Sequence, residues 1–369
     1  MWELTLTLKD SVSFIEYMIK RTTLVTLILI IVAGCSQGDS DLPSPVIEPS
    51  PKWLVPEEEL FDGGVGKDGI PSVDDPQFGK TSEVNRAFDN ELVLAVEHNG
   101  QIHAYPIPIL DWHEIVNDEI NGLPLAITYC PLTGTGVGWK RTFGSRTIAF
   151  GVSGLLYNSN LMPYDRRTNS TWSQQALLCV NGSRKGSIPE IFNLAETTLS
   201  TWKKMFPESE MMNANTGFDR RYSIYPYGDY RTNQDRLIFP VNHDDNRLPK
   251  KERVLGVIIN GKARVYQFNE EADGIEVIHD EFQDQKLIIV VSARDNFIKA
   301  FLNPSRTPFV PTADAFPAIM TDDDQNSYDI FGRHLNSLDP ELKLASPVSF
   351  MGYWFSWPAF YPDVEIFKE

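Results

Sequence analysis

The residues best suited to chemistry lie in two short stretches that are close together in the sequence. The first, Asp111–Asp118, contains a histidine among several carboxylates, and the second, Thr128–Gly136, contains Cys130 followed by a proline and a glycine-rich turn. A thiol at a strand end beside the backbone N–H groups of such a turn can have a lowered pKa. Cys130 is therefore a candidate nucleophile, redox group or metal ligand, and His113 is the histidine nearest to it in the sequence.

Three interpretations of this region are open. In the first, a soft metal ion such as copper is bound by thiolate, imidazole and thioether groups, which suit that ion. Its ligands would be His113, Cys130, His243 and Met162. In the second, Cys130 is a catalytic nucleophile or redox thiol, and His113 or His243 is its base. In the third, the thiol is buried without chemistry, and His113 and Glu114 complete a hydrogen-bond network in the core.

The cysteines also bear on these interpretations. The chain has three of them, Cys35, Cys130 and Cys179. Once a lipid occupies Cys35, the other two are the only thiols left, and in an oxidising compartment they can form a disulfide. Such a disulfide would exclude both the metal ligand and the nucleophile, and the spacing of the two residues leaves the question open.

The elements that position these residues are mainly β-strands. Apolar runs flank Asn99-Gly100, a pair typical of a type I′ hairpin turn, because both residues tolerate positive φ. The same arrangement recurs around Asn260-Gly261, and the two stretches continue in parallel beyond the turns. We interpret this as an internal duplication, with the two copies near residues 91–150 and 252–302.

Differences between the copies are informative. Sequence that folding demands should occur in both copies, whereas sequence that a functional site demands can occur in one. His113 and Cys130 occur only in the first copy, because the corresponding positions of the second hold Gly274 or Ile275, and Ser292. The comparison therefore favours a site in the first copy.

A helical pattern lies between the copies. It begins at Pro189-Glu190-Ile191 and continues through Trp202 to Met205-Phe206, with Pro207 as a stop. We therefore expect a mainly β fold of the α+β class. Two related β-rich units would form one compact body, with a short helical insert between them.

The first 34 residues are typical of a signal peptide. An apolar run follows Lys20-Arg21 and is too short to span a bilayer as a helix. The next residues, Val32-Ala33-Gly34-Cys35, resemble a bacterial lipobox, so we expect lipidation of Cys35. Because the acidic residues before Met18 suit a signal peptide poorly, Met18 is an alternative start.

The remaining chain divides into a tether and a folded domain. Residues 35–60 contain the lipidated cysteine and a proline-rich stretch that stays extended, and residues 61–369 form the domain. The expected location is the cell envelope, with the lipid anchor in a membrane and the domain facing the periplasm or the exterior. Ser36 favours the outer membrane in a bacterium that has two membranes.

The composition is that of a stable globular protein. Hydrophobic residues make up 42% and charged residues 22% of the chain, and the formal net charge is −17. No run of Lys or Arg is long enough to follow a phosphate backbone, so we expect no nucleic-acid partner. The acidic balance is consistent with solubility alone.

Several motifs carry a family resemblance. The sequence resembles the exported and lipoprotein members of the domain of unknown function numbered 3179, from about Asp68 to Asp363. The shared stretches include Trp112–Asp118, Thr128–Gly134, Ser153–Asn160, Tyr164–Arg166, Trp172–Gln174 and Pro226–Tyr230. Many relatives read Cys-Pro-Leu-Cys where this chain reads Cys130-Pro131-Leu132-Thr133, so a disulfide redox cycle within that motif is not available here.

The resemblance implies no reaction, because the activity of that family is not established. Its shared motifs supply the members of a further candidate pocket, which are Glu114, Asn117, Tyr157, Asn158, Asp165, Trp172 and Gln174. The first functional hypothesis is an extracytoplasmic lipoprotein that binds a metal or a small ligand at a Cys/His site. The alternatives are a Cys-dependent enzyme and a non-catalytic scaffold or partner-binding module.

Overall fold

Two β-hairpins with the same turn sequence organise the protein. The first joins β3 (Leu92–His98) to β4 (Gln101–Pro106), and the second joins β17 (Arg253–Ile259) to β18 (Lys262–Gln267). In each turn both residues have positive φ, 48° and 83° in the first and 51° and 74° in the second. The Asn-Gly pairs therefore form the tight hairpin turns that the sequence predicts.

The computed structural model describes residues 52–312, 315–337, 339 and 342–368. The predicted signal peptide, Cys35 and most of the predicted tether lie outside the described residues. Strands account for 42% and helices for 9% of the structure, which confirms the expected β-rich α+β class. No helix among the described residues is long and apolar enough to cross a membrane.

Each hairpin is followed by three antiparallel strands that lie side by side in a sheet. These strands are β5 (Ile115–Ile120), β6 (Leu123–Cys130) and β7 (Thr135–Lys140) after the first hairpin, and β19 (Glu276–Phe282), β20 (Gln285–Ser292) and β21 (Phe297–Leu302) after the second. The registers match, since Asp118 pairs with Leu125 in one sheet and Asp280 with Leu287 in the other. The duplication is therefore present at the level of strand pairing.

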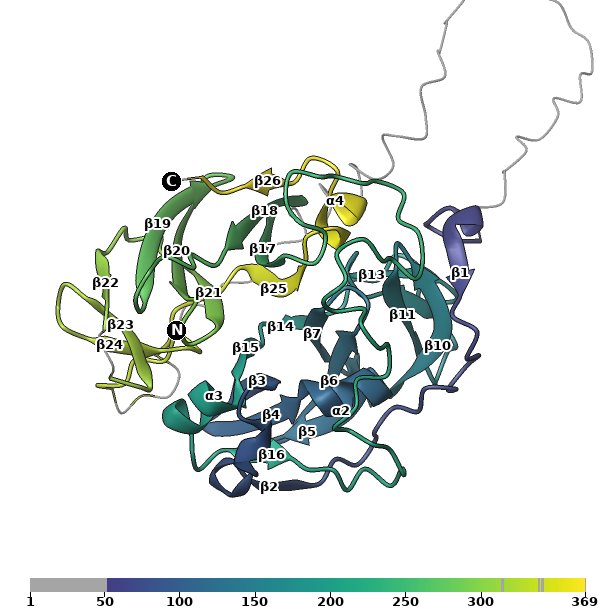
Figure 1. Cartoon of the computed structure of the whole chain (residues 1–369), viewed down its shortest axis with the longest axis horizontal. Helices are drawn as coiled ribbons and strands as arrows, with labels where there is room; N and C mark the ends of the chain where they lie inside the picture. Colours follow the sequence, from purple (N-terminus) through teal and green to yellow (C-terminus); the bar gives the residue numbers. More distant parts are fainter. Residues whose placement is uncertain (1–51, 313–314, 338, 340–341, 369) are drawn as a thin grey trace, which may run out of the picture. The chain divides into compact units, whose positions relative to one another are not determined.

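Each repeat also contains a strand, a helix and a second strand from further along the chain. These are β15 (Ala195–Thr198), α3 (Leu199–Met205) and β16 (Glu210–Met212) in the first, and β25 (Val348–Tyr353), α4 (Ser356–Phe360) and β26 (Glu365–Ile366) in the second. β15 and β25 pair antiparallel with the first strand of each hairpin, and β16 and β26 pair parallel with the second. The first repeat thus spans residues 92–212 and the second 253–366 (Figure 1).

The prediction of a helix from Pro189 to Phe206 is wrong for the first half of this segment. Residues Ile191–Phe192 form β14, which pairs with β7, and Ala195–Thr198 pair with β3. The helix begins only at Leu199, where the Thr198 side chain accepts a hydrogen bond from the backbone N–H of Thr201. Strand pairing outweighs the local helical periodicity here, and α3 belongs to the first repeat rather than to an insert between repeats.

The inserts within the repeats are themselves β-sheets. The first repeat contains β8 (Thr142–Phe143), β9 (Arg146–Thr147), β10 (Phe150–Tyr157), β11 (Asn160–Asp165), β12 (Thr171–Ser173) and β13 (Leu178–Asn181), and the second contains β22 (Phe309–Pro311), β23 (Ala318–Asp322) and β24 (Ser327–Asp329). Before the first hairpin lie β1 (Leu60–Asp62), β2 (Phe78–Lys80) and the 3-10 turns η1 (Glu57–Glu59), η2 (Thr81–Glu83) and η3 (Arg86–Phe88). β1 extends the sheet of β10 to β13, and β2 pairs with β16.

A charged network recurs in both repeats, buried in the first and partly buried in the second. In the first, Asp118 Oδ2 accepts a hydrogen bond from the Tyr105 hydroxyl at 2.6 Å and lies 2.7 Å from His103 Nδ1. In the second, Asp280 Oδ2 accepts hydrogen bonds from the Tyr266 hydroxyl at 2.6 Å and from an Arg264 guanidinium nitrogen at 2.7 Å. Because the network occurs twice, we assign it to folding rather than to a site.

Residues 213–252 connect the repeats, and we call them the linker. They contain no helix or strand, although irregular segments this long are uncommon and usually have a function. The linker runs across helix α2 (Ile107–His113) and strand β6 (Figure 1), where the Tyr230 hydroxyl donates to Leu132 O at 2.9 Å and Trp112 Nε1 donates to Ile224 O at 3.0 Å. It therefore covers one side of the first repeat.

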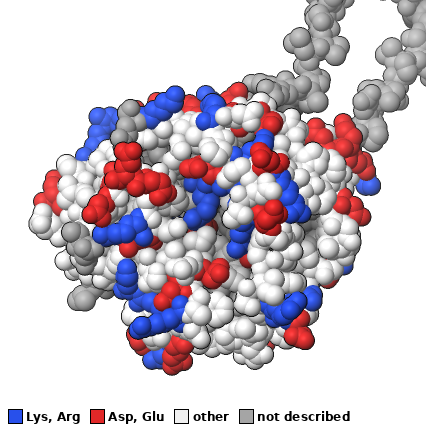
Figure 2. All heavy atoms as spheres, viewed as in Figure 1, with Lys and Arg blue, Asp and Glu red and all other residues white. Residues whose placement is uncertain are grey.

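The surface carries both signs of charge. Figure 2 shows acidic and basic side chains interspersed over one face of the molecule, without a continuous basic stripe on that face.

Candidate functional site

Helix α2 marks the place where the two repeats differ most. It occupies Ile107–His113 between β4 and β5, whereas the equivalent connection in the second repeat, residues 268–275, contains no helix. Pro106 and Pro108 suit the start of a helix, where a backbone N–H has no intrahelical acceptor. The helix ends at Glu114, whose φ of 57° is unusual for a residue other than glycine.

Cys130 lies at the end of β6 and is sealed from solvent. Its exposed fraction is 1%, and its neighbours on the same face are apolar side chains of the core. Its Sγ accepts a hydrogen bond from Leu161 N at 3.3 Å and donates to Ser159 O at 3.6 Å. Burial raises the pKa of the thiol to about 11, which is opposite to what a nucleophile or thiolate ligand needs.

His113 is fully buried at the end of α2, with both ring nitrogens engaged. Its Nδ1 lies 2.7 Å from Pro71 O, which can only accept, so Nδ1 carries a proton and donates. Nε2 therefore accepts from the Tyr222 hydroxyl at 2.7 Å. Burial lowers the pKa of His113, so the neutral ring is favoured and neither nitrogen is available to a metal or a thiol.

The other two proposed metal ligands lie elsewhere. Leu161 packs with Cys130 in one core cluster, whereas Met162 packs in another cluster, because successive residues of β11 point to opposite faces. His243 is exposed on the linker. Among the described residues, no group of three or more His, Cys, Asp and Glu side chains is placed to hold a metal ion. The structure does not bring the predicted copper ligands together, so the metal hypothesis gains no support from it.

Cys130 and Cys179 are both free thiols. The Cys179 thiol donates to Thr171 O at 3.5 Å and to Asn181 O at 3.4 Å, within the sheet of β10 to β13. The disulfide that the sequence left open is not formed in this structure.

Among the other motif residues, Gln174 belongs to a fully buried network of neutral side chains. Asn160 Nδ2 donates to Gln174 Oε1 at 2.8 Å, and to Thr133 Oγ1 and Thr135 Oγ1 at 2.9 and 3.0 Å. Gln174 Nε2 donates to Thr128 Oγ1 at 2.9 Å. These contacts join β6, β7 and β11, so the motif residues that make them hold the fold together.

Asn117 and Asn158 also bridge segments of the fold. Asn117 accepts from Phe150 N at 2.9 Å and donates to Phe150 O at 2.8 Å, which fixes β10 against β5. Asn158 donates to Ala359 O at 3.1 Å and accepts from Asn242 N at 2.8 Å.

The remaining candidates are similarly placed. Asp165 accepts from Thr168 N at 2.6 Å and from Trp172 Nε1 at 3.3 Å, which closes a turn. The ring of Tyr157 packs edge-on against Phe360 at 5.5 Å. Of the predicted pocket residues, only Glu114 has surroundings that suggest chemistry.

Two buried carboxyl groups lie at the end of α2, under the linker. Asp111 is 3% exposed; its Oδ2 accepts a hydrogen bond from Arg231, and its Oδ1 has no partner among the described residues. Among the described residues, the Glu114 carboxyl accepts a hydrogen bond only from the Tyr227 hydroxyl, at 3.4 Å. Burial raises the pKa of Asp111 to about 7 and that of Glu114 to about 8. Sequence reasoning missed Asp111, although it stands in the same motif as His113.

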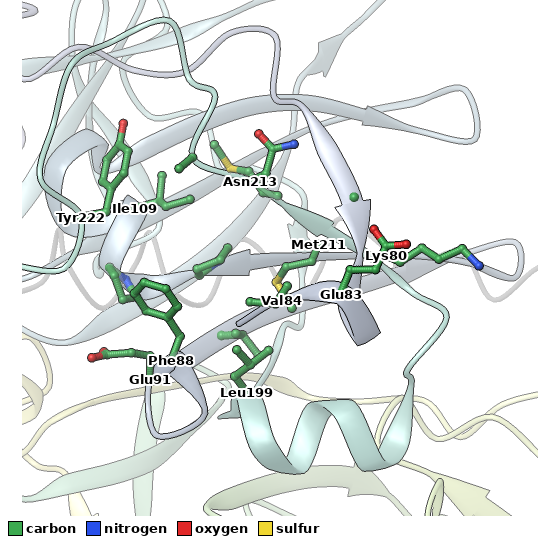
Figure 3. A pocket seen from close by; sticks show the side chains of 16 residues that line it. Lys80, Glu83, Val84, Phe88, Glu91, Ile109, Leu199, Met211, Asn213 and Tyr222 are labelled. Carbon is green, nitrogen blue, oxygen red and sulfur yellow. The ribbon is translucent and has the colours of Figure 1, made fainter. Parts of the chain in front are cut away.

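An apolar pocket of about 400 Å³ lies beside α2 (Figure 3). It is lined by Gly79, Lys80, Glu83, Val84, Phe88, Glu91, Val93, Pro106, Pro108, Ile109, Leu199, Met211, Met212, Asn213, Ala214 and Tyr222. In the close-up, the Lys80 amine and the Tyr222 hydroxyl point away from the apolar centre. The interior is therefore formed by aliphatic, aromatic and thioether groups.

The pocket and the predicted site share one contact. Tyr222 belongs to the pocket wall, and its hydroxyl is the group that donates to His113 Nε2. Tyr222 also lies 2.6 Å from Thr216 Oγ1, so its hydroxyl is held from two sides. His113 thus helps to position a wall of the pocket.

The comparison with family models agrees with these motifs. The model for proteins of unknown function named DUF3179 matches residues 67–364. The chain belongs to the DUF3179 family. The DUF3179 match includes both hairpins, the three antiparallel strands after each hairpin, the linker and every residue that lines the pocket. No curated protein matches the chain, and no solved structure does.

Proposed function

We propose that this DUF3179 protein binds a small, mainly apolar molecule in the pocket beside α2, which we call the α2 pocket. The observation that carries the proposal is the pocket itself, whose volume of about 400 Å³ lies in the usual range for ligand sites. Apolar side chains form its interior, and the polar groups lie at the rim (Figure 3). This is the small-ligand part of the hypothesis from the sequence, moved to a neighbouring site.

The comparison between repeats supports a function at this position. The equivalent surface of the second repeat is a depression with a mixed lining of six charged or polar residues and five apolar ones, the former including Arg247, Gln267 and Lys368. Gln267 stands where the first repeat has Pro106 in the matching strand. The second repeat folds without an apolar pocket at this position, which favours a functional rather than a structural role for the pocket of the first repeat.

The expected affinity is moderate. Burying about 250 Å² of apolar ligand surface contributes roughly 6 kcal/mol at about 25 cal/mol per Å². Favourable packing adds to this figure, and the loss of translational and rotational freedom opposes it. We therefore expect dissociation constants in the micromolar range or weaker for small aromatic probes.

The test uses N-phenyl-1-naphthylamine, a neutral fluorophore that brightens in apolar surroundings. Gly79 offers a way to fill the pocket without a clash, because a Cβ built there meets no atom within 4 Å. Its cross-strand partner is Met211, which also lines the pocket, so a side chain at position 79 projects on that face. We expect Gly79→Phe to abolish saturable binding of the probe.

The matched control is Gly79→Ala, which adds one methyl group at the same backbone position. We expect it to bind the probe within about threefold of the parent, because most of the cavity stays open. Equal binding by the parent and Gly79→Phe, or no saturable binding by the parent, would disprove the proposal.

The proposed location is the cell envelope, with a lipid on Cys35 as the membrane anchor. The support is the lipobox-like sequence Val32-Ala33-Gly34-Cys35 and the proline-rich tether after it. Cells that express the chain would be grown with an alkyne-labelled fatty acid. We expect label in the parent protein and none in Cys35→Ser. Label of equal strength in both would refute lipidation at this residue.

A further inference from the structure

The charged groups around the α2 pocket are not balanced. Three charged residues line it, Lys80, Glu83 and Glu91. The Lys80 ammonium is already paired with Glu208 at 2.8 Å. Neither Glu83 nor Glu91 has a cation within ion-pair distance among the described residues, and Glu91 is half-buried. The pocket therefore has an apolar interior and two unpaired carboxylates at its rim (Figure 3).

Two cations near the rim, Lys80 and Lys203, are committed to other carboxylates. Lys203 is bonded to Asp89 at 2.7 Å and to Val84 O at 2.8 Å. Glu208 and then Glu83 raise the pKa of Lys80, so this ammonium is held in a negative environment. A ligand that brings its own positive charge would find the carboxylates at the rim available.

A third carboxyl group lies behind the pocket wall. Asp111 is on α2, two residues after the pocket residue Ile109, and Glu91 is close enough to act on it electrostatically. Burial is the main cause of the raised pKa of Asp111, Arg231 opposes it, and the negative charge of Glu91 adds to it. The side of the pocket at Glu91 thus faces acidic groups both at the rim and behind the wall.

From this arrangement we infer that the ligand of the α2 pocket is an apolar amine, with its hydrocarbon body in the cavity and its ammonium group at the rim beside one of the two carboxylates, Glu91 or Glu83, which lie at opposite ends of the pocket (Figure 3). The inference rests on the proposed function and adds the chemical class of the ligand. An anion of the same size would meet repulsion at the rim, whereas a cation would meet a carboxylate at either end of the pocket at little cost in desolvation.

Three naphthalene compounds of similar size test the charge. They are 1-naphthylmethylamine, which is a cation at neutral pH, 1-naphthalenemethanol, which is neutral, and 1-naphthaleneacetate, which is an anion. Each is used to displace N-phenyl-1-naphthylamine from the parent protein at low ionic strength. We expect the order amine, alcohol, acetate, with the amine about five- to tenfold more effective than the acetate. The difference should shrink in 0.5 M salt, because salt screens exposed charges.

Variants locate the preference. The double variant Glu83→Gln with Glu91→Gln should bring the amine-to-acetate ratio close to one, and each single variant should lower it about two- to threefold. The matched control is Glu58→Gln, which removes an exposed carboxylate outside the pocket and should leave the ratio as in the parent.

The outcomes separate this inference from the proposed function. If the probe does not bind, or binds equally to Gly79→Phe, the α2 pocket is not a ligand site and both ideas fall. If the probe binds but amine and acetate displace it equally, the α2 pocket remains a ligand site and only the inference of an amine ligand is wrong. A preference that persists in the double variant also overturns the inference, because the charge would then come from other residues.

Discussion

Glu114 combines an unusual backbone conformation with a carboxyl group that has little to bind. It ends α2 with positive φ, its N–H donates to Leu110 O at 2.7 Å, and its C=O accepts from Tyr129 N at 2.7 Å. Both backbone contacts fix the residue under the linker. The carboxyl is carried into the protein by this geometry, and burial raises its pKa to about 8.

Glu114→Gln tests this pKa. In the folded protein the pKa of Glu114 lies above its ordinary value of 4.5. The stability that Glu114 contributes is therefore present below pH 4.5 and is lost as pH rises through about 8. Glutamine stays neutral, and the variant should gain stability relative to the parent between pH 5 and pH 9, by a few kcal/mol and at most about 5. Urea unfolding at both pH values measures this gain. An unchanged difference between the two proteins across this range would contradict the prediction.

Cys130 gives a second prediction for a single residue. With a pKa of about 11, only about one thiol in a few thousand is ionised at pH 7.5. Both Cys130 and Cys179 are buried, so we expect iodoacetamide to label neither residue at an appreciable rate in the folded protein and to label both after unfolding. Mass spectrometry of peptides would measure the labelling. Rapid labelling of Cys130 in the folded protein would contradict this prediction and support the hypothesis of a Cys-dependent enzyme.

At the scale of elements, the linker is held by a buried lysine. Lys251 Nζ donates to the carbonyl oxygens of Tyr230, Asn233 and Arg236 at 3.1, 3.3 and 2.7 Å, and it lies 3.5 Å from the centre of the Tyr230 ring. The ammonium group donates hydrogen bonds to three backbone carbonyl groups that lie outside any strand or helix. This explains how a segment without regular structure stays packed over α2.

Lys251→Met should loosen the linker. The substitution leaves three carbonyl groups without this donor, which we expect to cost about 2–4 kcal/mol. Proteinase K should then cut within residues 213–252 faster than in the parent. The adjacent Lys250→Met serves as control, because Lys250 pairs with the exposed Asp244 and should have little effect. Equal cleavage of the two variants would show that Lys251 does not anchor the linker.

At the scale of the whole molecule, the two repeats share their strand pairing and charged network and differ in the segments that pack around these strands. His103 lies between Asp118 and Glu210, as Arg264 lies between Asp280 and Glu365. Helix α2 and the α2 pocket occur in the first repeat, and the linker packs over the same helix. Function is therefore expected where the repeats diverge.

The repeated network predicts matched energetic effects. Tyr105→Phe and Tyr266→Phe each remove a hydroxyl that donates to a carboxylate at 2.6 Å, and each should cost about 1–3 kcal/mol in urea unfolding. Tyr157→Phe is the control, because the contact of the Tyr157 hydroxyl with Asn242 is exposed and longer, at 3.4 Å. A large cost for one tyrosine and none for the other would mean that the two networks are not equivalent.

The second half of each repeat carries a signal of the duplication in its sequence. Thr201-Trp202, Phe206-Pro207 and Glu210 recur with the same spacing as Ser356-Trp357, Tyr361-Pro362 and Glu365. Both tryptophans are fully buried beside their hairpins. The short helical pattern conceals this match, because by itself it indicates a separate insert between the repeats.

The sequence by itself determined the hairpins, the β-rich class and the family, because turn chemistry, alternation and long motifs are local properties. Only the tertiary structure decided that Cys130 faces a sealed core, that His113 bonds to Tyr222 from the linker, and that an apolar pocket opens beside α2. These features depend on contacts between residues that lie from 29 to 109 positions apart in the sequence. Which face of a strand is covered, and by what, is set by packing of the whole chain.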